Sequence, residues 1–206
     1  MLLKGRFLSK AELMDRIAGE VTVCVKCSLW HGRHNAVPGQ GDIEASVVFV
    51  GEAPGYWEDA KGLPFLGAAG KVLDKLLENI GLLREKVFIT NIVKCRPPSN
   101  REPRSLEIAT CTELYLNSQI ALIHPKIIVT LGRTSTAYIL SKAGLVNVES
   151  ITSLHGRIFD VKFITLAVEV FPTFHPASVL HNPTYRDKLK SDFQILKAAL
   201  QNRQII

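Results

Sequence analysis

Short apolar segments that contain β-branched residues recur along the chain. Each is too short for a helix and shows no alternation of polar and apolar positions. This pattern is typical of strands that are covered on both faces, as in a parallel sheet. The predicted strands are residues 46–50, 87–92, 126–131 and 168–173.

Helical patterns separate these strands. In residues 70–80 the apolar side chains recur at helical spacing, and Gly81 follows as a C-cap. The other predicted helices are residues 104–123, 134–143 and 185–201. Strands that alternate with helices indicate βαβ units, with helices on both faces of the sheet. Residues 156–170 break the alternation and predict an antiparallel hairpin that leads into the last strand.

The composition is that of an ordinary globular protein. Its 206 residues are enough for one domain, residues 1–206, with a single large core. Hydrophobic residues make up 47% and charged residues 21%, which excludes a disordered or fibrous chain. No apolar run approaches the roughly 20 residues that span a bilayer, and the N-terminal segment has no signal-peptide pattern. We therefore expect a cytoplasmic protein with no membrane partner, in a compartment where disulfides are uncommon.

The chain is basic, with a formal net charge of +6. An excess of Lys and Arg favours a polyanionic partner, because neutralised phosphates release their counterions. Many globular proteins are mildly basic without binding nucleic acid, so the charge alone leaves both interpretations open.

Four cysteines form two groups that are far apart in the sequence. Cys24 and Cys27 form a C-x-x-C pair, in which two intervening residues let both sulfurs face one metal, and Cys95 and Cys111 follow much later. An even number of cysteines in a cytoplasmic protein favours a metal site over disulfides. Four thiolates suit either a structural zinc or a four-iron cluster, and the spacing does not decide between them.

The chemically unusual residues follow directly after the predicted strands. In open α/β folds, ligands bind beyond the carboxyl ends of the strands. Residues 51–55 (GEAPG), 90–95 (TNIVKC) and 174–177 (FHPA) occupy these places, and the glycine-flanked loop of residues 62–67 carries Phe65 beside the same crevice. In one interpretation Phe65 stacks on a base; in the other, which its local sequence favours, it is an ordinary core side chain.

Two polar side chains stand out at these strand ends. Asn91 lies in an apolar run, where a buried amide needs partners; it bonds to backbone or reads the edge of a ligand, because it offers both a donor and an acceptor. His175 is either a catalytic donor or a structural histidine. Arg96, Arg101 and Arg104 are candidates for phosphate contact, against the alternative of solvated surface arginines.

Taken together, these segments closely resemble the family 4 uracil-DNA glycosylases, the iron–sulfur enzymes of thermophilic bacteria and archaea. The similar segments run from residue 24 to about residue 190, in the family's order and spacing. They are Cys24-x-x-Cys27, residues 50–55 (VGEAPG), 62–67 (GLPFLG), 90–98 (TNIVKCRPP), Asn100-Arg101, Cys111 and residues 175–177 (HPA). Each signal is modest by itself, and together they are highly specific.

The resemblance implies an α/β fold, namely a three-layer α/β/α sandwich with a central four-stranded, mainly parallel sheet. It implies a [4Fe-4S] cluster, rather than zinc, on Cys24, Cys27, Cys95 and Cys111. It also implies a monofunctional DNA glycosylase that flips uracil out of DNA and hydrolyses its N-glycosidic bond, leaving an abasic site. This reaction begins the base excision repair of deaminated cytosine.

The same resemblance implies roles for the residues of the crevice. Phe65 stacks on the flipped uracil, Asn91 pairs with its edge, and backbone amides around Ala53 receive its O2. His175 donates to the same oxygen. The amide of Asn91 matches the O4 acceptor and the N3–H donor of uracil, whereas cytosine presents the opposite pattern at both atoms.

Two glutamates complete the implied site. Glu58 resembles the residue that guards the C5 side of the base, where thymine carries a methyl group. The wider superfamily often has a water-orienting aspartate where Ala53 stands here, and Glu52 is the nearest ionisable substitute. Whether Glu52 orients water or braces the loop stays open. Its presence favours family 4 over a related family that has an uncharged residue there.

We expect a monomer that acts on uracil-containing DNA, single- or double-stranded. No segment carries a convincing sliding-clamp contact. Two alternatives remain: a related glycosylase with broader substrates, such as deaminated purines, and a non-catalytic iron–sulfur DNA-binding module that has kept the scaffold.

Overall fold

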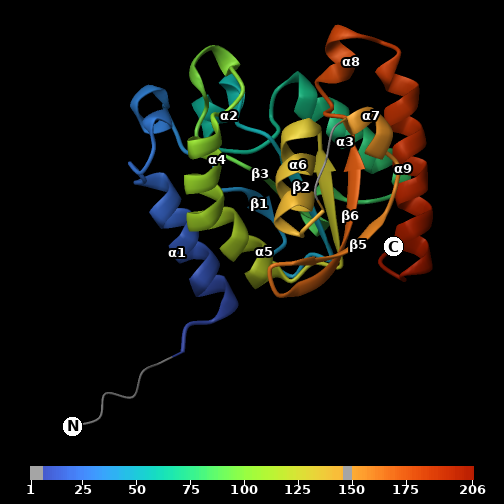
Figure 1. Ribbon diagram of the computed structural model, residues 1–206, viewed down its shortest axis with the longest axis horizontal. Coiled ribbons are helices and arrows are strands. Elements are labelled where there is room, and N and C mark those ends of the chain that lie inside the picture. Colours follow the sequence, from blue (N-terminus) through green and yellow to red (C-terminus); the bar gives the residue numbers. More distant parts are fainter. Residues whose placement is uncertain (1–6, 146–149) are drawn as a thin grey trace.

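A mixed six-stranded sheet lies at the centre of the computed structural model, which describes residues 7–145 and 150–206 (Figure 1). The order of the strands across the sheet is β1 (Gln40–Gly41), β3 (Phe88–Asn91), β2 (Val47–Gly51), β4 (Ile127–Leu131), β6 (Leu166–Thr173) and β5 (Phe159–Phe163). The inner strands β3, β2, β4 and β6 run parallel to one another, and the edge strands β1 and β5 are antiparallel to their neighbours.

The prediction of a four-stranded sheet was wrong in the number of strands. The four predicted strands form the parallel inner part, and the predicted hairpin forms β5 and β6, but the two edge strands extend the sheet to six within the described residues. No sequence pattern marks β1, because it has two residues, one of them glycine, and it pairs with Phe88 and Ile89. The predicted domain, residues 1–206, includes residues 1–6 and 146–149, which lie outside the described residues.

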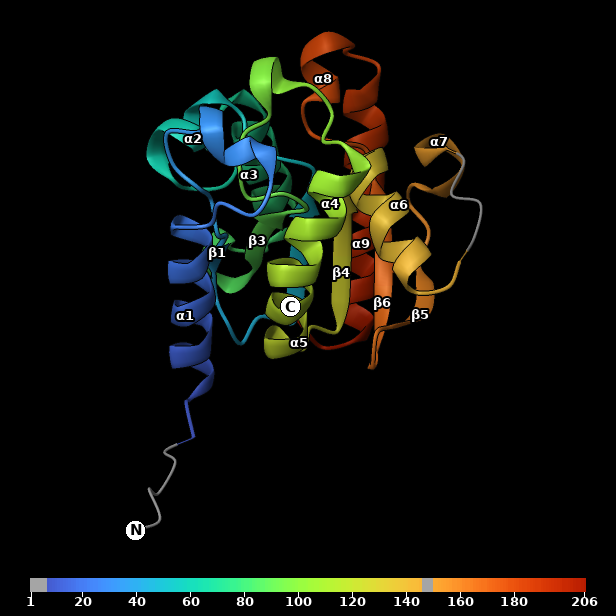
Figure 2. The same ribbon diagram turned by 60° about the vertical axis from the view of Figure 1, so that its left-hand side comes forward.

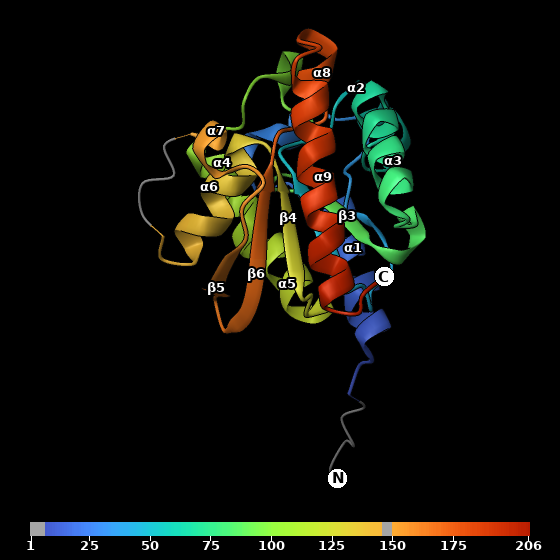
Figure 3. The same ribbon diagram turned by 90° about the vertical axis from the view of Figure 1, so that its right-hand side faces the viewer.

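Helices cover both faces of the sheet, as the sequence predicted. The helices that pack on it are α1 (Lys10–Thr22), α5 (Asn117–Ile123) and α6 (Arg133–Lys142) on one face, and α3 (Ala68–Ile80) and α9 (Tyr185–Asn202) on the other. Alternate residues of β2 separate the two cores: Val48 and Val50 face the first group, and Val47 and Phe49 face the second. Figure 2 shows the first group in front of the sheet, and Figure 3 shows α9 and α3 on the opposite face.

The predicted helix of residues 104–123 is one helical segment with a wider turn in its middle. It consists of α4 (Ser105–Cys111), a π-helical turn (Thr112–Leu116) and α5. Cys111 therefore ends α4 directly before the π turn, a rare feature that occurs frequently at functional sites. None of the helices in the described part of the chain is long and apolar enough to cross a membrane.

The parallel strands all end at the same edge of the sheet. Their last residues are Gly51, Asn91, Leu131 and Thr173. Two short helices, α2 (Tyr56–Lys61) and α8 (Ser178–His181), lie at this end of the molecule (Figure 3). The remaining short helices are Ser28–Gly32, Arg84–Lys86, Pro98–Asn100 and α7 (Ile151–Leu154).

Candidate active site

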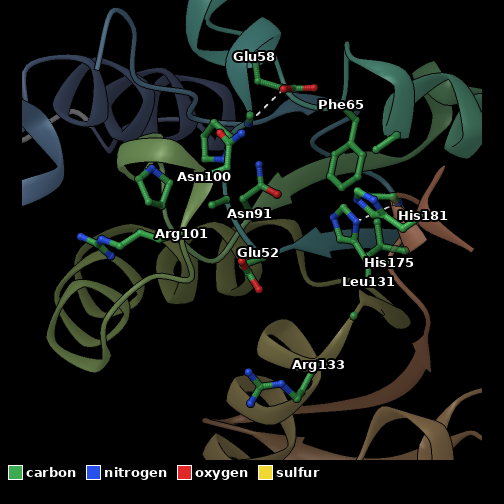
Figure 4. A pocket seen from close by; sticks show the side chains of 17 residues that line it. Glu52, Glu58, Phe65, Asn91, Asn100, Arg101, Leu131, Arg133, His175 and His181 are labelled. Atoms are coloured by element: carbon green, nitrogen blue, oxygen red, sulfur yellow. Dashed lines mark hydrogen bonds between the residues drawn. The ribbon is translucent and has the colours of Figure 1, made fainter. Parts of the chain in front are cut away.

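A pocket of about 410 Å³ opens at the carboxyl ends of the parallel strands (Figure 4). Its position is the one that open α/β folds use for ligands. All six side chains predicted from the sequence for catalysis or substrate binding line it: Glu52, Ala53, Glu58, Phe65, Asn91 and His175. Residues from three loops, the short helix α2 and the end of β3 are thus brought to one cavity, although their roles in it stay predictions.

Phe65 is held in an unusual backbone conformation. Its φ is +51°, in the left-handed region that non-glycine residues rarely adopt and that clusters at functional sites. Two glycines make room for it: a Cβ on Gly70 would meet the carbonyl oxygen of Phe65, and a Cβ on Gly51 would lie 2.7 Å from its ring. The ring of Phe65 lies 5.7 Å from that of His175, with 30° between the planes.

Asn91 is the last residue of β3 and is 1% exposed. Within the part of the chain that the structure describes, its side-chain oxygen is buried and has no hydrogen-bond partner. A buried acceptor without a donor is costly, by about 1–3 kcal/mol, and calls for an explanation. A ligand with an N–H group in the pocket would satisfy it.

Lys94 holds the end of the same strand through hydrogen bonds. Its ammonium group is fully buried and donates to Thr90 Oγ1, to the backbone carbonyl of Asn91 at 2.9 Å and to Gln119 Oε1 at 2.7 Å. Burial lowers its pKa to about 8. Three acceptors use its three donors, so this cation fixes the backbone of Asn91 rather than reaching into the pocket.

His175 faces the pocket as a neutral donor. Its Nδ1 accepts from the backbone N–H of Ala177 at 3.1 Å, which leaves the proton of a neutral ring on Nε2. Burial lowers the pKa of His175 to about 4. Gly132, with φ +94°, allows the close approach, since a Cβ there would lie 3.0 Å from the His175 Cβ.

The carboxylate of Glu58 joins two loops of the pocket. Glu58 is 9% exposed. Its Oε1 accepts from the backbone N–H groups of Leu66 and Gly67, both at 2.8 Å, and its Oε2 accepts from that of Gly55 at 3.1 Å. These bonds tie the loop that carries Phe65 to the turn after β2.

Glu52 belongs to a polar network at the N-terminus of α6. The hydroxyl of Thr134 donates to Glu52 Oε2 at 2.5 Å and also lies 3.2 Å from Glu102 Oε1. Arg133 donates to both oxygens of Glu102, at 2.6 and 2.8 Å. Sequence reasoning missed Arg133 and Thr134. Their place directly after the strand that ends at Leu131 was the signal that could have found them.

The arginine candidates differ in their surroundings. Arg101 lines the pocket, and its guanidinium donates two hydrogen bonds, at 2.7 and 2.8 Å, to Glu107. This pairing is the main cause that lowers the pKa of Glu107 to about 2. Arg96 lies beside the pocket rim, and Arg104 is exposed at the start of α4. His181 of α8 also lines the pocket, and no sequence signal pointed to it.

The four cysteines meet beside a small cavity that is separate from the pocket. Cys24, Cys27, Cys95 and Cys111 all line it, and none is in a disulfide. Two sulfurs accept hydrogen bonds, Cys95 Sγ from the Arg33 guanidinium at 3.0 Å and Cys111 Sγ from a backbone N–H at 3.3 Å. Among the described residues, no group of three or more His, Cys, Asp or Glu side chains is placed to hold a single metal ion.

A chain of hydrogen bonds connects the cysteines with the pocket. The hydroxyl of Ser28, next to Cys27, donates to Glu107 at 2.8 Å. Glu107 in turn holds Arg101, which lines the pocket. The buried side chain of Glu107 is held in one conformation, because both of its carboxylate oxygens accept hydrogen bonds.

Comparisons with known proteins assign the chain to a family. Residues 38–200 match the Uracil DNA glycosylase superfamily, and that superfamily is the class of protein to which the chain is assigned. The chain is 49% identical to the type-4 uracil-DNA glycosylase of Saccharolobus solfataricus over 193 residues, which are 93% of this chain and 88% of the relative. The chain is 52% identical to the type-4 uracil-DNA glycosylase of Sulfurisphaera tokodaii, over 89% of this chain and 83% of the relative. It is 44% identical to that of Archaeoglobus fulgidus, over 89% of this chain and 91% of the relative. The chain belongs to the type-4 uracil-DNA glycosylase family, as the resemblance predicted.

Proposed function

We propose that the pocket at the strand ends takes up uracil flipped out of DNA and hydrolyses its N-glycosidic bond, leaving an abasic site. A base inside a duplex is inaccessible, so it must be extruded at a cost of a few kcal/mol. Removal of uracil is the first step in the repair of deaminated cytosine. Membership in the type-4 family supports this reaction.

The observation that carries the proposal is the buried side-chain oxygen of Asn91, which has no hydrogen-bond partner in residues 7–145 and 150–206. Uracil offers an N3–H to this oxygen and an O4 to the amide nitrogen of the same side chain. Cytosine has an acceptor at N3 and a donor at its amino group, so it would face Asn91 with the wrong partner at both atoms. Phe65, beside Asn91 in the same pocket, supplies a flat ring for the face of the base.

His175 would stabilise the leaving group. As the bond breaks, negative charge develops on uracil and is shared by O2. The Nε2–H of a neutral His175, together with backbone amides around Ala53, is aimed at this oxygen in our proposal. A donor in such an arrangement stabilises the transition state by about 3 kcal/mol. The low pKa of His175 keeps the ring neutral, with its remaining proton on Nε2.

Glu52 would direct the water. Its Oε2 is fixed by the Thr134 hydroxyl, and its Oε1 makes no hydrogen bond within the described residues. The free oxygen can accept a proton from the water whose oxygen bonds to the sugar C1′, while uracil N1 takes the electrons of the broken bond. The same carboxylate favours the cationic sugar.

Glu58 would act through the two loops that it joins. Its three backbone hydrogen bonds support a bracing role, which sets the distance between Phe65 and the turn after β2. The exclusion of thymine at C5 stays a prediction for this residue.

The four cysteines would hold a [4Fe-4S] cluster. Their convergence on one cavity fits a group that binds one thiolate at each iron, and the N–H donors to two of the sulfurs fit thiolates. Burial raises the pKa of Cys111 to about 12, and bound iron would offset this by stabilising the thiolate. Because the four cysteines lie outside the pocket, a cluster held by them would supply structural support.

A panel of oligonucleotides tests the proposed function. Each carries one uracil, hypoxanthine or mismatched thymine, and alkali cleaves the strand wherever a base has been removed. We expect strand breaks at uracil. Breaks at hypoxanthine at a comparable rate would favour the broader glycosylase, and binding without any break would favour the non-catalytic DNA-binding module.

A further inference from the structure

Two exposed aromatic side chains stand side by side at the start of α2. Tyr56 is 56% exposed and Trp57 is 58% exposed. Their rings are 5.2 Å apart at an interplanar angle of 84°. The guanidinium of Arg96 lies over the Tyr56 ring, 5.3 Å from its centre. Rings of this size are normally buried, so their exposure as a pair indicates a surface with a partner.

The pair lies on the rim of the pocket, between two of its loops. Gly55, the residue before Tyr56, lines the pocket. On one side, Arg96 donates from Nε to Asn100 Oδ1 at 2.8 Å, and Asn100 is a lining residue. On the other side, Trp57 lies against Gly67, since a Cβ on that glycine would be 3.5 Å from the indole ring. The aromatic surface is therefore continuous with the pocket but not part of its lining.

A flipped nucleotide remains bonded to its neighbours, so the DNA strand must cross the rim of the pocket, of which this surface is one part. Every base has a flat face that stacks on aromatic rings without regard to sequence, and arginine adds a favourable cation–π contribution. Aromatic rings with a cation close to them, next to a pocket for one base, match the chemistry of a second base. A phosphate would use the guanidinium but not the two aromatic faces, so a base makes fuller use of this surface.

We propose that Tyr56, Trp57 and Arg96 form a stacking platform for one unpaired nucleobase that adjoins the uracil on the same DNA strand. The proposal rests on the proposed function, because it places the uracil in the adjoining pocket. It predicts that the platform lowers KM for substrates with an unpaired base next to uracil, whatever that base is, and leaves kcat unchanged.

The kinetic test combines two variants with two substrates. The double variant Tyr56→Ala/Trp57→Ala is compared with wild type on a short single-stranded oligonucleotide that has one uracil between thymines, and on one in which abasic residues replace those thymines. We expect the KM of the double variant to be about tenfold higher on the first substrate and equal to that of wild type on the second. The control is Leu83→Ala: Leu83 is 56% exposed before β3, away from the strand end that carries Asn91. This control variant should have the same KM as wild type on both substrates.

A KM increase of equal size on both substrates, or no increase on either, would overturn the platform. A binding measurement separates this outcome from failure of the proposed function and does not depend on the folding of the alanine variant. In the Trp30→Phe variant, Trp57 is the remaining tryptophan of the two in the chain. A uracil-free single-stranded oligonucleotide should quench its fluorescence, and an abasic strand of the same length should not. Equal quenching by both strands would also overturn the platform, whereas quenching without uracil release would leave it standing and contradict the proposed function.

Discussion

At the scale of single residues, the proposed site depends most on the local bonding of Asn91 and His175. Among the described residues, Asn91 has a buried acceptor without a donor, and the ring of His175 is fixed through its Nδ1. Both were candidates from the sequence, because an amide in an apolar run and a histidine after a strand are unusual. The bonds of Glu58 could not be read from the sequence, since they depend on how two loops meet.

The rate of uracil release should not titrate with an ordinary histidine. The pKa of His175 is lowered to about 4, so the ring stays neutral at every pH above that value. Single-turnover rates should be flat from about pH 7, below the pKa of about 8 of Lys94, to about pH 5, above that of His175. The folded protein binds fewer protons here than the unfolded chain, so this residue's contribution to stability is lost as pH falls from about 6.5 to about 4. A loss of rate with a midpoint near pH 6.5 that disappears in His175→Gln would contradict this account.

Replacing Glu58 by glutamine should loosen the Phe65 loop. An amide has one acceptor oxygen where the carboxylate has two, so at least one backbone N–H of Gly55, Leu66 or Gly67 would lose its partner. We expect the free energy of unfolding to fall by about 1–3 kcal/mol and KM to rise. Denaturant titration and initial rates measure both. Glu78→Gln, an exposed change on α3, is the matched control, and equal effects of the two substitutions would refute the bracing role.

At the scale of secondary-structure elements, the strands were predictable and the loops were not. Residues buried on both faces give an unbroken apolar run, so the parallel strands could be read from the sequence. β1 has too few residues to give a pattern. The π turn after Cys111 could not be predicted either, because the apolar positions of its segment still recur at helical spacing. The left-handed conformation of Phe65 could not be predicted from the sequence, because the glycines that make room for it are not adjacent to it in the chain.

Gly51→Ala tests whether the pocket requires a residue without a side chain at the end of β2. A Cβ there would meet the Asn91 side-chain oxygen and would lie 2.7 Å from the Phe65 ring. We expect uracil release to slow by about a hundredfold, because displacements of about 1 Å in an active site have effects of this size. Gly19→Ala is the control, since nothing lies within 4 Å of a Cβ at that helical position and it should stabilise the protein by about 0.5–1 kcal/mol. An active Gly51→Ala enzyme would show that Phe65 and Asn91 need not be fixed as described.

At the scale of the whole molecule, the four cysteines bring three distant segments to one cavity. These segments are the region after α1, the loop after β3 and the end of α4, and the bonds of Ser28, Glu107 and Arg101 lead from there to the pocket. The sequence identified the cysteines but not this path, because its members are spread along the chain.

Removal of the metal should therefore weaken the fold and the pocket together. The purified protein should contain about four iron atoms per chain. Chelation of the iron should lower Tm and weaken binding to a uracil-containing strand, since the loop after β3 loses its support. Metal analysis, thermal melting and DNA binding measure the three effects. A colourless protein with one zinc and no iron would refute the cluster.

Asn91, as the residue proposed to hold uracil, is the central residue of the pocket. The most direct measurement is the single-turnover rate of uracil release from a single-stranded oligonucleotide by Asn91→Ala, with Asn202→Ala, an exposed change at the end of α9, as the control. Loss of two hydrogen bonds to the base, each of about 1–1.5 kcal/mol, predicts a rate that is lower by about a hundredfold with a melting curve close to that of wild type. A rate within about twofold of wild type would contradict the assignment of uracil to this pocket.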